Sequence, residues 1–450
     1  MKVVVAGAGI SGLAIGRELR RRGMEVSVLE ADARAGGKVR SERIQGFLCE
    51  DGPGSYLEDA ESRALLDAAG LSDCMVKAST GARRRYLCVG GRLMRAPESP
   101  PTFFKSEVVG FLSKLRVFGD VFLPRGPAGR GEEESVRAFA RRRVGRRVAD
   151  RMVAAVVSGI YAGDPDQISV LSAFPRMAEM EREHRSLILA ALRAGRRGGP
   201  RGREIASFSG GMQQATDALA HELFDALRPR VALRRVDAAG RGFTLAVEQD
   251  GSVGEIGADA VVLAIPAPDA AAVTGRLDAP AADALLAIPY AAVAVLHLGF
   301  AREDVSHPLD GFGFLVPPGE GRPLLGALFS SSLFHGRAPD GSVLVTALCG
   351  GAMRPDVIAL PDGALVESVL DDLRAVLGIR AAPRFSRVVR HARAIPQYTL
   401  HHRERVAAVE AAQARHAGLF FAGNAYRGVA FTDCLRNAGP LCDRIVALAR

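Results

Sequence analysis

A glycine-rich segment near the N-terminus has the residue types and spacing of a turn that binds a dinucleotide. Gly7, Gly9 and Gly12 form a GxGxxG pattern between a strand-like apolar run at 3–6 and a stretch of helical period at 13–22. The first glycine permits the tight turn, the second lets the backbone approach a pyrophosphate, and the third lets helix and strand pack closely. The free N–H groups at the helix N-terminus favour the phosphates.

An acidic residue and a second glycine pair follow this motif. Glu30 ends the next predicted strand, where its carboxylate can accept hydrogen bonds from ribose hydroxyls. The segment Arg34-Ala35-Gly36-Gly37-Lys38 and the block at 46–55 come next. Together they resemble the extended fingerprint of the large flavin oxidoreductase superfamily, which includes amine oxidases and phytoene desaturases. The resemblance implies FAD and not a nicotinamide cofactor, with the second block near the isoalloxazine.

The elements that must position these residues are those of an α/β protein. After the first βαβ unit the sequence predicts a helix and then a hairpin turned at Gly90-Gly91. Helices are predicted at 213–227 and 433–448, and strands at 85–89, 92–94, 231–236, 243–249, 256–264, 293–300, 313–316, 325–329, 343–348 and 419–421. We therefore expect a discontinuous Rossmann-like FAD-binding domain with a mixed α/β substrate domain and a helical membrane-associated insertion.

The predicted domain boundaries follow from these elements. The FAD-binding domain takes residues 1–80, 205–268 and 395–450, and the substrate-binding domain takes 81–100 and 269–394. The helical insertion takes 101–204, which holds 20 Lys+Arg against 12 Asp+Glu and hence a net charge of +8 out of +9 for the whole chain. Such a basic segment favours an anionic membrane face or an acidic ligand.

Three stretches of this insertion carry separate predictions. Residues 101–125 are predicted to form an apolar helix with basic residues between its apolar ones. This helix either packs inside the fold or inserts into one leaflet of a membrane. The arginine run at 141–147 is interpreted as a solvated helix face, and Arg182–Arg203 as a helix end with a mobile loop. No nucleic-acid motif accompanies these runs, so no nucleic-acid partner is expected.

Several kinds of chemistry find no support in the residues. The six cysteines form no CxxC pair, so neither a zinc site nor a disulfide framework is expected, and no metal is assigned. No Ser/His/Asp set or paired carboxylates occur, and we therefore expect no catalytic acid or base. The histidines interpreted as structural are His184, His297, His391, His401 and His402. Without a signal-peptide layout or an apolar run of about 18 residues, a cytoplasmic location is expected, with peripheral membrane contact left open.

Motifs later in the chain narrow the resemblance. Over nearly its whole length the sequence resembles the protoporphyrinogen/coproporphyrinogen oxidase family. The segments that carry the resemblance lie at 158–164, 288–290, 311–317, 325–326, 395–398, 423–429 and 432–434. The resemblance implies a flavin-dependent oxidation of a tetrapyrrole, a large apolar disc with anionic propionates at its rim.

The resemblance also implies which residues make the site. The implied FAD contacts are Gly7, Ala8, Gly9, Ile10, Ser11, Gly12, Glu30, Arg34, Gly36, Gly37, Lys38, Gly52, Pro53, Gly54, Ser55, Val236, Gly428, Val429 and Ala430. The backbone carbonyl of Gly159 would meet pyrrole nitrogens, and the macrocycle would lie among Phe312, Leu315, Leu328 and Leu348. Relatives place an arginine that pairs with a propionate in a segment matching 96–102, which has none here. Arg95 or Lys105 is predicted to substitute for it.

The implied reaction removes six hydrogens from protoporphyrinogen IX in three two-electron flavin cycles, with oxygen reduced to hydrogen peroxide. Aromatisation drives it, so the protein has to position the substrate and exclude water. Coproporphyrinogen III oxidation is the first alternative. Extra basic residues at the rim of the cavity would distinguish it from protoporphyrinogen IX oxidation. An amine oxidase or carotenoid desaturase, and a non-catalytic binding protein, are further alternatives. A membrane surface and a second copy in a homodimer stay open as partners.

Overall fold

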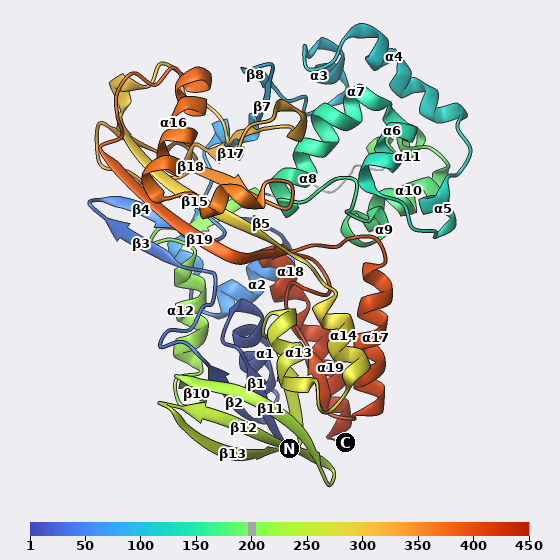
Figure 1. Ribbon diagram of the computed structural model, residues 1–450, viewed down its shortest axis with the longest axis vertical. Helices are drawn as coiled ribbons and strands as arrows, with labels where there is room; N and C mark the ends of the chain where they lie inside the picture. The colour runs from blue at the N-terminus through green and yellow to red at the C-terminus, as the bar shows by residue number, and fades with distance from the viewer. Residues whose placement is uncertain (197–203, 450) are drawn as a thin grey trace.

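The computed structural model describes residues 1–196 and 204–449, and Figure 1 shows two halves of the molecule that meet across its middle. The lower half in that view is built on a five-stranded parallel sheet of order β10-β2-β1-β14-β20. The upper half holds a seven-stranded sheet with a group of helices beside it. The chain is therefore a mixed α/β protein, as expected from the sequence.

The five-stranded sheet begins with the βαβ unit that the glycine motif predicts. Its elements are β1 (Lys2–Ala6), α1 (Ile10–Arg21) and β2 (Glu25–Glu30). Val3, Val4 and Val5 are fully buried because both faces of the sheet are covered. The remaining strands, β10 (Leu227–Pro229), β14 (Ala260–Leu263) and β20 (Leu419–Phe421), come from far along the chain. Three separated stretches thus build one sheet.

Helices and small sheets cover both faces of this sheet. On one face lie α1, α2 (Ala60–Ala68), α12 (Gln213–Glu222), α18 (Phe431–Arg436) and α19 (Ala438–Leu448). On the other lie β11 (Val231–Ala239), β12 (Gly242–Gln249), β13 (Ser252–Ala258), α13 (Ala267–Thr274), α14 (Ala279–Leu286) and α17 (His402–Arg415). Two further small sheets are present. One pairs β3 (Ser41–Ile44) with β4 (Phe47–Glu50), and the other has β9 (Glu204–Phe208) between β5 (Tyr56–Glu58) and β6 (Met75–Lys77).

The seven-stranded sheet has order β19-β15-β18-β17-β16-β7-β8. Its strands are β7 (Tyr86–Val89), β8 (Arg92–Arg95), β15 (Tyr290–Ala301), β16 (Gly313–Leu315), β17 (Leu324–Leu328), β18 (Ser342–Gly350) and β19 (Phe385–Pro396). The predicted hairpin is confirmed by the register of β7 on β8. Helix α16 (Asp362–Leu377) packs on one face, where Leu296, Phe300 and Val345 are buried with it. The opposite face of the sheet is turned toward the rest of the molecule.

The segment between β8 and β9 is helical. Its helices are α3 (Pro100–Lys105), α4 (Phe111–Phe118), α5 (Pro127–Arg130), α6 (Val136–Val144), α7 (Arg146–Val148), α8 (Ala154–Tyr161), α9 (Val170–Ala173), α10 (Pro175–His184) and α11 (Leu187–Arg196). Part of the predicted Arg182–Arg203 loop, residues 197–203, lies outside the described residues. Among the residues on either side of that gap, none of the helices is long and apolar enough to span a bilayer.

The prediction of one helix over 101–125 is wrong. The helix breaks after α3, and the chain between α3 and α4 carries Val108 and Val109, which are buried against the sheet residues Leu87 and Val89. The guanidinium of Arg151 donates to the Val108 carbonyl at 2.8 Å. Burial of the two valines therefore interrupts a run whose local pattern favours a continuous helix.

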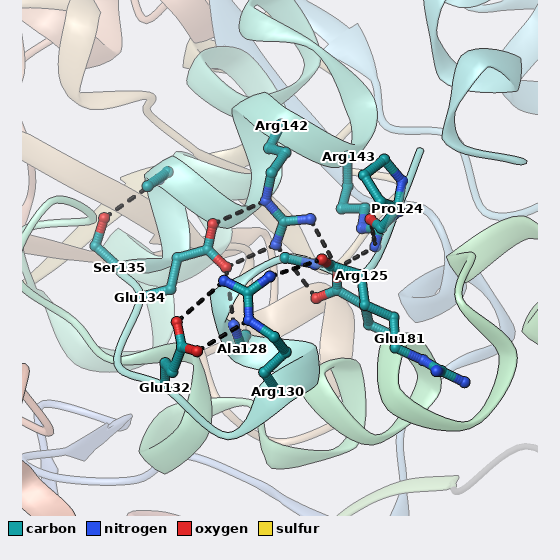
Figure 2. A network of polar contacts seen from close by, with 12 residues as sticks. Pro124, Arg125, Ala128, Arg130, Glu132, Glu134, Ser135, Arg142, Arg143 and Glu181 are labelled. Carbon is teal, nitrogen blue, oxygen red and sulfur yellow. Dashed lines mark hydrogen bonds and ion pairs between the residues drawn. The ribbon is translucent and has the colours of Figure 1, made fainter. Parts of the chain in front are cut away.

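The interpretation of 141–147 as a solvated helix face is also wrong in part. Arg143 is completely buried, where it pairs with Asp120 at 3.1 Å and with Glu181. Figure 2 shows Arg142 between Glu134 and Glu181, each 2.7 Å away. Burial alone would raise the pKa of Glu181, but hydrogen bonds from Arg142, the Gly126 N–H and Arg143 lower it. Only the outer part of the run, such as Arg146, faces solvent.

Two other predicted elements are divided. The predicted strand at 256–264 is two strands, because Asp259 exchanges hydrogen bonds with Lys2 where the chain leaves β13 for β14. The predicted helix at 433–448 is α18 and α19, which meet at Asn437. Pro440 lies in the first turn of α19, where its missing N–H costs no hydrogen bond.

Candidate active site

The turn after β1 has no space for side chains at two of its glycines. Gly7 has a φ of +96°, and a Cβ there would lie 2.5 Å from the Ala264 carbonyl oxygen. A Cβ on Gly12 would lie 1.9 Å from the Gly7 carbonyl oxygen. A Cβ on Gly9 would meet no atom within 4 Å, so the N-terminus of α1 opens onto free space. A pyrophosphate can approach the backbone at this point.

Glu30 lies at the carboxyl end of β2, beside this turn. Its carboxylate accepts hydrogen bonds from the Ala8 N–H at 2.8 Å and the Asp32 N–H at 2.9 Å. Burial raises the pKa of Glu30, and the two backbone hydrogen bonds oppose that shift. The carboxylate is thereby held in one orientation, with lone pairs left for ribose hydroxyls.

The second glycine pair lies directly against the first motif. The Gly36 N–H donates to the Ala8 carbonyl at 2.7 Å, and Gly36 has a φ of +112°. A Cβ on Gly37 would lie 3.3 Å from the Gly9 Cα. The chain at 36–37 therefore forms a second wall of the space in front of α1.

The two cations that flank this pair bind backbone carbonyls. Arg34 donates to the Gly37 carbonyl at 3.3 Å. The Lys38 ammonium donates to the Ala394 carbonyl at 2.8 Å and to that of Arg393, both on β19. Burial, followed by repulsion from Arg393, lowers the pKa of Lys38 to about 8. Lys38 thus ties the glycine pair to the seven-stranded sheet.

Other predicted cofactor residues lie on elements around the same turn. A Cβ on Gly52 would lie 2.1 Å from the Lys38 carbonyl oxygen, which places the 52–55 block beside the glycine pair. The turn at 428–430 precedes α18, whose Phe431 shares a hydrophobic cluster with Ile10 of α1. Val236 is buried in the cluster that contains Leu29, the neighbour of Glu30. Segments far apart in the sequence therefore converge at the carboxyl ends of β1 and β2.

These residues fit FAD. The first turn of α1 carries no acidic side chain, and its N-cap Gly9 has no side chain to cover the helix N–H groups. The open space at Gly9 and the fixed carboxylate of Glu30 suit a pyrophosphate and a ribose respectively. Both the 36–37 and 52–55 segments extend this surface toward the seven-stranded sheet, as an extended flavin dinucleotide requires.

The three leucines predicted to hold the macrocycle share one face of the seven-stranded sheet. Leu315 pairs with Gly326, which pairs in turn with Leu348, and Leu328 lies two residues beyond Gly326 on β17. Paired residues in a ladder share a face, as do alternate residues along a strand. All three leucines therefore project away from α16, and none belongs to the cluster that α16 buries.

Helix α8 lies opposite this face. A Cβ on Gly159 would lie 2.6 Å from Cδ2 of Leu315, so the helix approaches the sheet at that glycine. Val156 and Ile160, within one turn of Gly159, remain 41% and 45% exposed although both are apolar. Phe312 shares a cluster with Leu328. The helix therefore packs on the sheet at Leu315, and Val156 and Ile160 leave apolar surface exposed beside this contact.

Arg95 does not lie at this space. It pairs with Tyr86 across the hairpin, while Leu87 and Met94 form the pair on the leucine face. Its guanidinium binds Glu98 at 3.1 Å. The role of Arg95 as propionate anchor stays a prediction, and the strand register does not favour it.

Arg85 is the cation that the sequence reasoning missed. It precedes Leu87 by two residues and so lies on the side of the sheet that carries Leu315. Its guanidinium carbon lies 5.7 Å from the centroid of the Phe312 ring. In the part of the chain that the structure describes, no carboxylate lies within ion-pair distance of it. The strand alternation of 85, 87 and 89 was the signal that could have identified it.

The histidines of this region belong to the fold. His297 is fully buried on β15, and burial lowers its pKa to about 3. Its Nδ1 lies 3.2 Å from the Thr346 hydroxyl. His391 binds the Asp51 carbonyl at 2.7 Å, and the His402 ring stacks on Tyr398 at 4.1 Å. No group of three or more His, Cys, Asp or Glu side chains that could hold a metal occurs among the described residues.

Comparisons with known proteins show the family of this chain. The model of the family described as flavin containing amine oxidoreductase matches residues 10–446. The chain is 31% identical to the chloroplastic protoporphyrinogen oxidase of Oryza sativa subsp. japonica, covering 97% of this chain and 86% of the relative. It is also 31% identical to the coproporphyrinogen III oxidase of Propionibacterium freudenreichii, covering 99% and 91%.

A solved structure shows the same fold. A crystal structure from Exiguobacterium sp. that carries a provisional protoporphyrinogen oxidase name superposes with a TM-score of 0.84 at 24% identity, covering 100% of this chain and 99% of that one. The chain is accordingly an FAD-dependent oxidoreductase. It belongs to the flavin containing amine oxidoreductase family and, within it, to the branch of protoporphyrinogen and coproporphyrinogen oxidases.

Proposed function

We propose that this protein oxidises protoporphyrinogen IX to protoporphyrin IX in haem biosynthesis. The observation that carries the proposal is the pair of opposed apolar faces, Leu315, Leu328 and Leu348 against Gly159 of α8, next to a surface that fits FAD. An apolar disc can lie against the exposed apolar surface beside this contact, and Arg85 at its edge can pair with a carboxylate on the rim of the disc.

Each turn of the reaction removes one hydride and one proton from the macrocycle, and three turns reduce three oxygen molecules to three hydrogen peroxide molecules. Bound FAD supplies the two-electron acceptor. The residues of this chain hold the macrocycle, orient its carbon toward the cofactor and exclude water. The Gly159 carbonyl, at an exposed position of α8, can accept hydrogen bonds from pyrrole N–H groups.

The test is anaerobic mixing of the purified flavoprotein with protoporphyrinogen IX. We expect flavin absorbance near its visible maximum to bleach, and porphyrin fluorescence to rise as it does so. Admission of oxygen should restore the flavin colour and release hydrogen peroxide. Bound flavin that is not reduced by protoporphyrinogen IX or by coproporphyrinogen III would overturn the proposal, and amines and polyenes would then be the next substrates.

Coproporphyrinogen III is the second candidate substrate. The similarity to the Propionibacterium freudenreichii enzyme favours it, since that relative matches nearly the whole chain. The same anaerobic assay with this substrate ranks the two by their rates of flavin reduction.

We further propose that the α3–α4 region touches a membrane surface, on the cytoplasmic side. Phe111, Leu112 and Phe122 are 70%, 79% and 84% exposed, and Figure 1 shows α4 at the outer end of the molecule. Lysines and arginines flank these side chains, among them the exposed Lys105 and Arg146. Apolar side chains beside cations suit the boundary of an anionic bilayer.

Co-sedimentation with vesicles that contain anionic phospholipid tests this surface. We expect Leu112→Glu to release the protein from the vesicles. Val253→Glu is the matched control, because Val253 is 72% exposed on β13, at the opposite end of the molecule. Equal binding by wild type and Leu112→Glu would contradict the proposal.

A further inference from the structure

A buried ion pair lies at the end of β4, where the chain enters the 52–55 block. Asp51 is buried, and its carboxylate accepts a hydrogen bond from Arg387 of β19 at 3.0 Å. The Asp51 carbonyl also accepts one from His391 of the same strand, at 2.7 Å. The seven-stranded sheet thus fixes both the side chain and the backbone of the residue that precedes the block.

The sheet side of this ion pair lies on the face that carries the leucines. Arg387 pairs with His297 across β19 and β15. His297 pairs with Thr346 on β18, which pairs in turn with Leu328 on β17. Paired residues share a face, so one row of side chains runs from Arg387 to the predicted substrate surface. Burial, followed by repulsion from Arg387, lowers the pKa of His297 to about 3, and this row therefore adds no further charge near neutral pH.

The chain after Asp51 adjoins the glycine pair of the cofactor surface. A Cβ on Gly52 would lie 2.1 Å from the Lys38 carbonyl oxygen, and a Cβ on Gly37 would lie 3.3 Å from the Gly9 Cα. Asp51 therefore lies between the turn that suits the pyrophosphate and the face that carries the leucines. A cofactor that extends from the first to the second has to pass this segment.

Four charged side chains meet here, two of each sign, and they differ in exposure. Arg387 also binds Glu42 at 2.9 Å, and Arg40 lies 3.5 Å from Asp51. The side chains of Glu42 and Arg40 are 42% and 53% exposed, whereas those of Asp51 and Arg387 are 6% and 19% exposed. Because water screens the outer pair, the inner pair of Asp51 and Arg387 dominates the electric field at the neighbouring backbone.

We propose that the inner pair, Asp51 and Arg387, sets the reduction potential of the bound flavin. Reduction adds negative charge to the isoalloxazine, so a nearby carboxylate opposes it and a nearby guanidinium favours it. In the intact pair the two effects offset each other, and loss of either side chain leaves one unit charge uncompensated.

The size of the effect follows from the reach of the chain. Four extended residues span at most about 14 Å, so a group that contacts the 52–55 backbone lies within roughly 18 Å of Asp51. At an effective dielectric constant of about 20, one unit charge at that distance changes the ratio of reduced to oxidised flavin about fivefold. A shorter distance gives a larger change.

The experiment measures the potential of the bound flavin in the holoenzyme by stepwise reduction beside a reference dye, at pH 8 and low salt. At a fixed potential, we expect Asp51→Asn to raise the ratio of reduced to oxidised flavin at least about fivefold, and Arg387→Gln to lower it by a similar factor. Arg387→Lys keeps the charge and should stay near the wild-type ratio. Glu42→Gln is the matched control, because Glu42 binds the same guanidinium from the exposed side, and it should change the ratio less than about twofold.

The opposite signs of the first two variants are a result that a structural role would not give, since a loosened segment would shift both in one direction. Shifts of one sign, no shift in either variant, or a shift with Glu42→Gln as large as that with Asp51→Asn would overturn the inference. Visible absorbance and thermal melting report flavin content and folding, and the sign of the remaining variant decides if the other loses its flavin. No porphyrinogen enters the measurement, so its outcome is independent of the proposed reaction.

Discussion

Replacing Arg85 by glutamine tests which cation of the β7–β8 hairpin anchors a propionate. Arg85 lies on the leucine face and has the Phe312 ring as its contact, whereas Arg95 lies on the other face and binds Glu98. A guanidinium that binds a carboxylate contributes about 1.5–3 kcal/mol, which corresponds to roughly 10- to 150-fold in affinity. We therefore expect Arg85→Gln to lower kcat/KM for protoporphyrinogen IX by a factor in this range.

The fold should tolerate the change. Arg85 is exposed, and a cation over an aromatic ring at such a site contributes about 0.5–1 kcal/mol. The midpoint of urea unfolding should therefore move little. Arg95→Gln is the matched control on the same hairpin, and we expect it to leave kcat/KM nearly unchanged. A larger loss with Arg95→Gln than with Arg85→Gln would refute the assignment by strand register and restore the prediction made from the sequence.

Further variants test the cofactor turn, a buried arginine and a buried histidine. Gly12→Ala should purify without flavin colour, because its Cβ would lie 1.9 Å from the Gly7 carbonyl oxygen; the ratio of visible to ultraviolet absorbance measures this. Arg143→Met should lower the free energy of unfolding by about 3–5 kcal/mol, because the buried Asp120 loses its ion pair and Glu181 keeps only Arg142. Arg146→Ala on the exposed side should change it by less than about 0.5 kcal/mol. His402 has its pKa lowered by burial to about 4, so the folded state binds fewer protons than the unfolded state and stability falls as the pH drops from about 6.5 toward 4. His402→Phe keeps the ring and should flatten this loss in urea titrations at several pH values.

Controls for these variants come from the same chain. Gly257→Ala, where a Cβ meets no atom within 4 Å, should keep its flavin. Flavin retention by Gly12→Ala would contradict the close packing of α1 on the turn. A small stability loss for Arg143→Met would show that its carboxylates reach water or protonate. An unchanged pH profile for His402→Phe would mean that another group, such as His297, accounts for the acid loss of stability.

The sequence by itself determined the features that depend on neighbouring residues. The spacing of Gly7, Gly9 and Gly12 between a buried strand and a helix is a local requirement of the turn, and the structure has that turn. The hairpin at Gly90-Gly91 and the individual strands of the second sheet follow from turn chemistry and alternation. These elements are specified by short-range backbone sterics, so residue types suffice to predict them.

Tertiary structure decided which side of a helix or strand a residue faces, and where a long helix-like sequence pattern is interrupted. Arg143 is buried and Arg146 exposed within one arginine run, because Asp120 and Glu181 arrive from other helices. Arg85 and not Arg95 shares the face of the leucines, because the register of β7 on β16 and β8 fixes which residues face that side. Residues distant in the sequence provide the burial and the charges that decide which way these side chains face. The positions of those residues in space cannot be read from the order of residues along the chain.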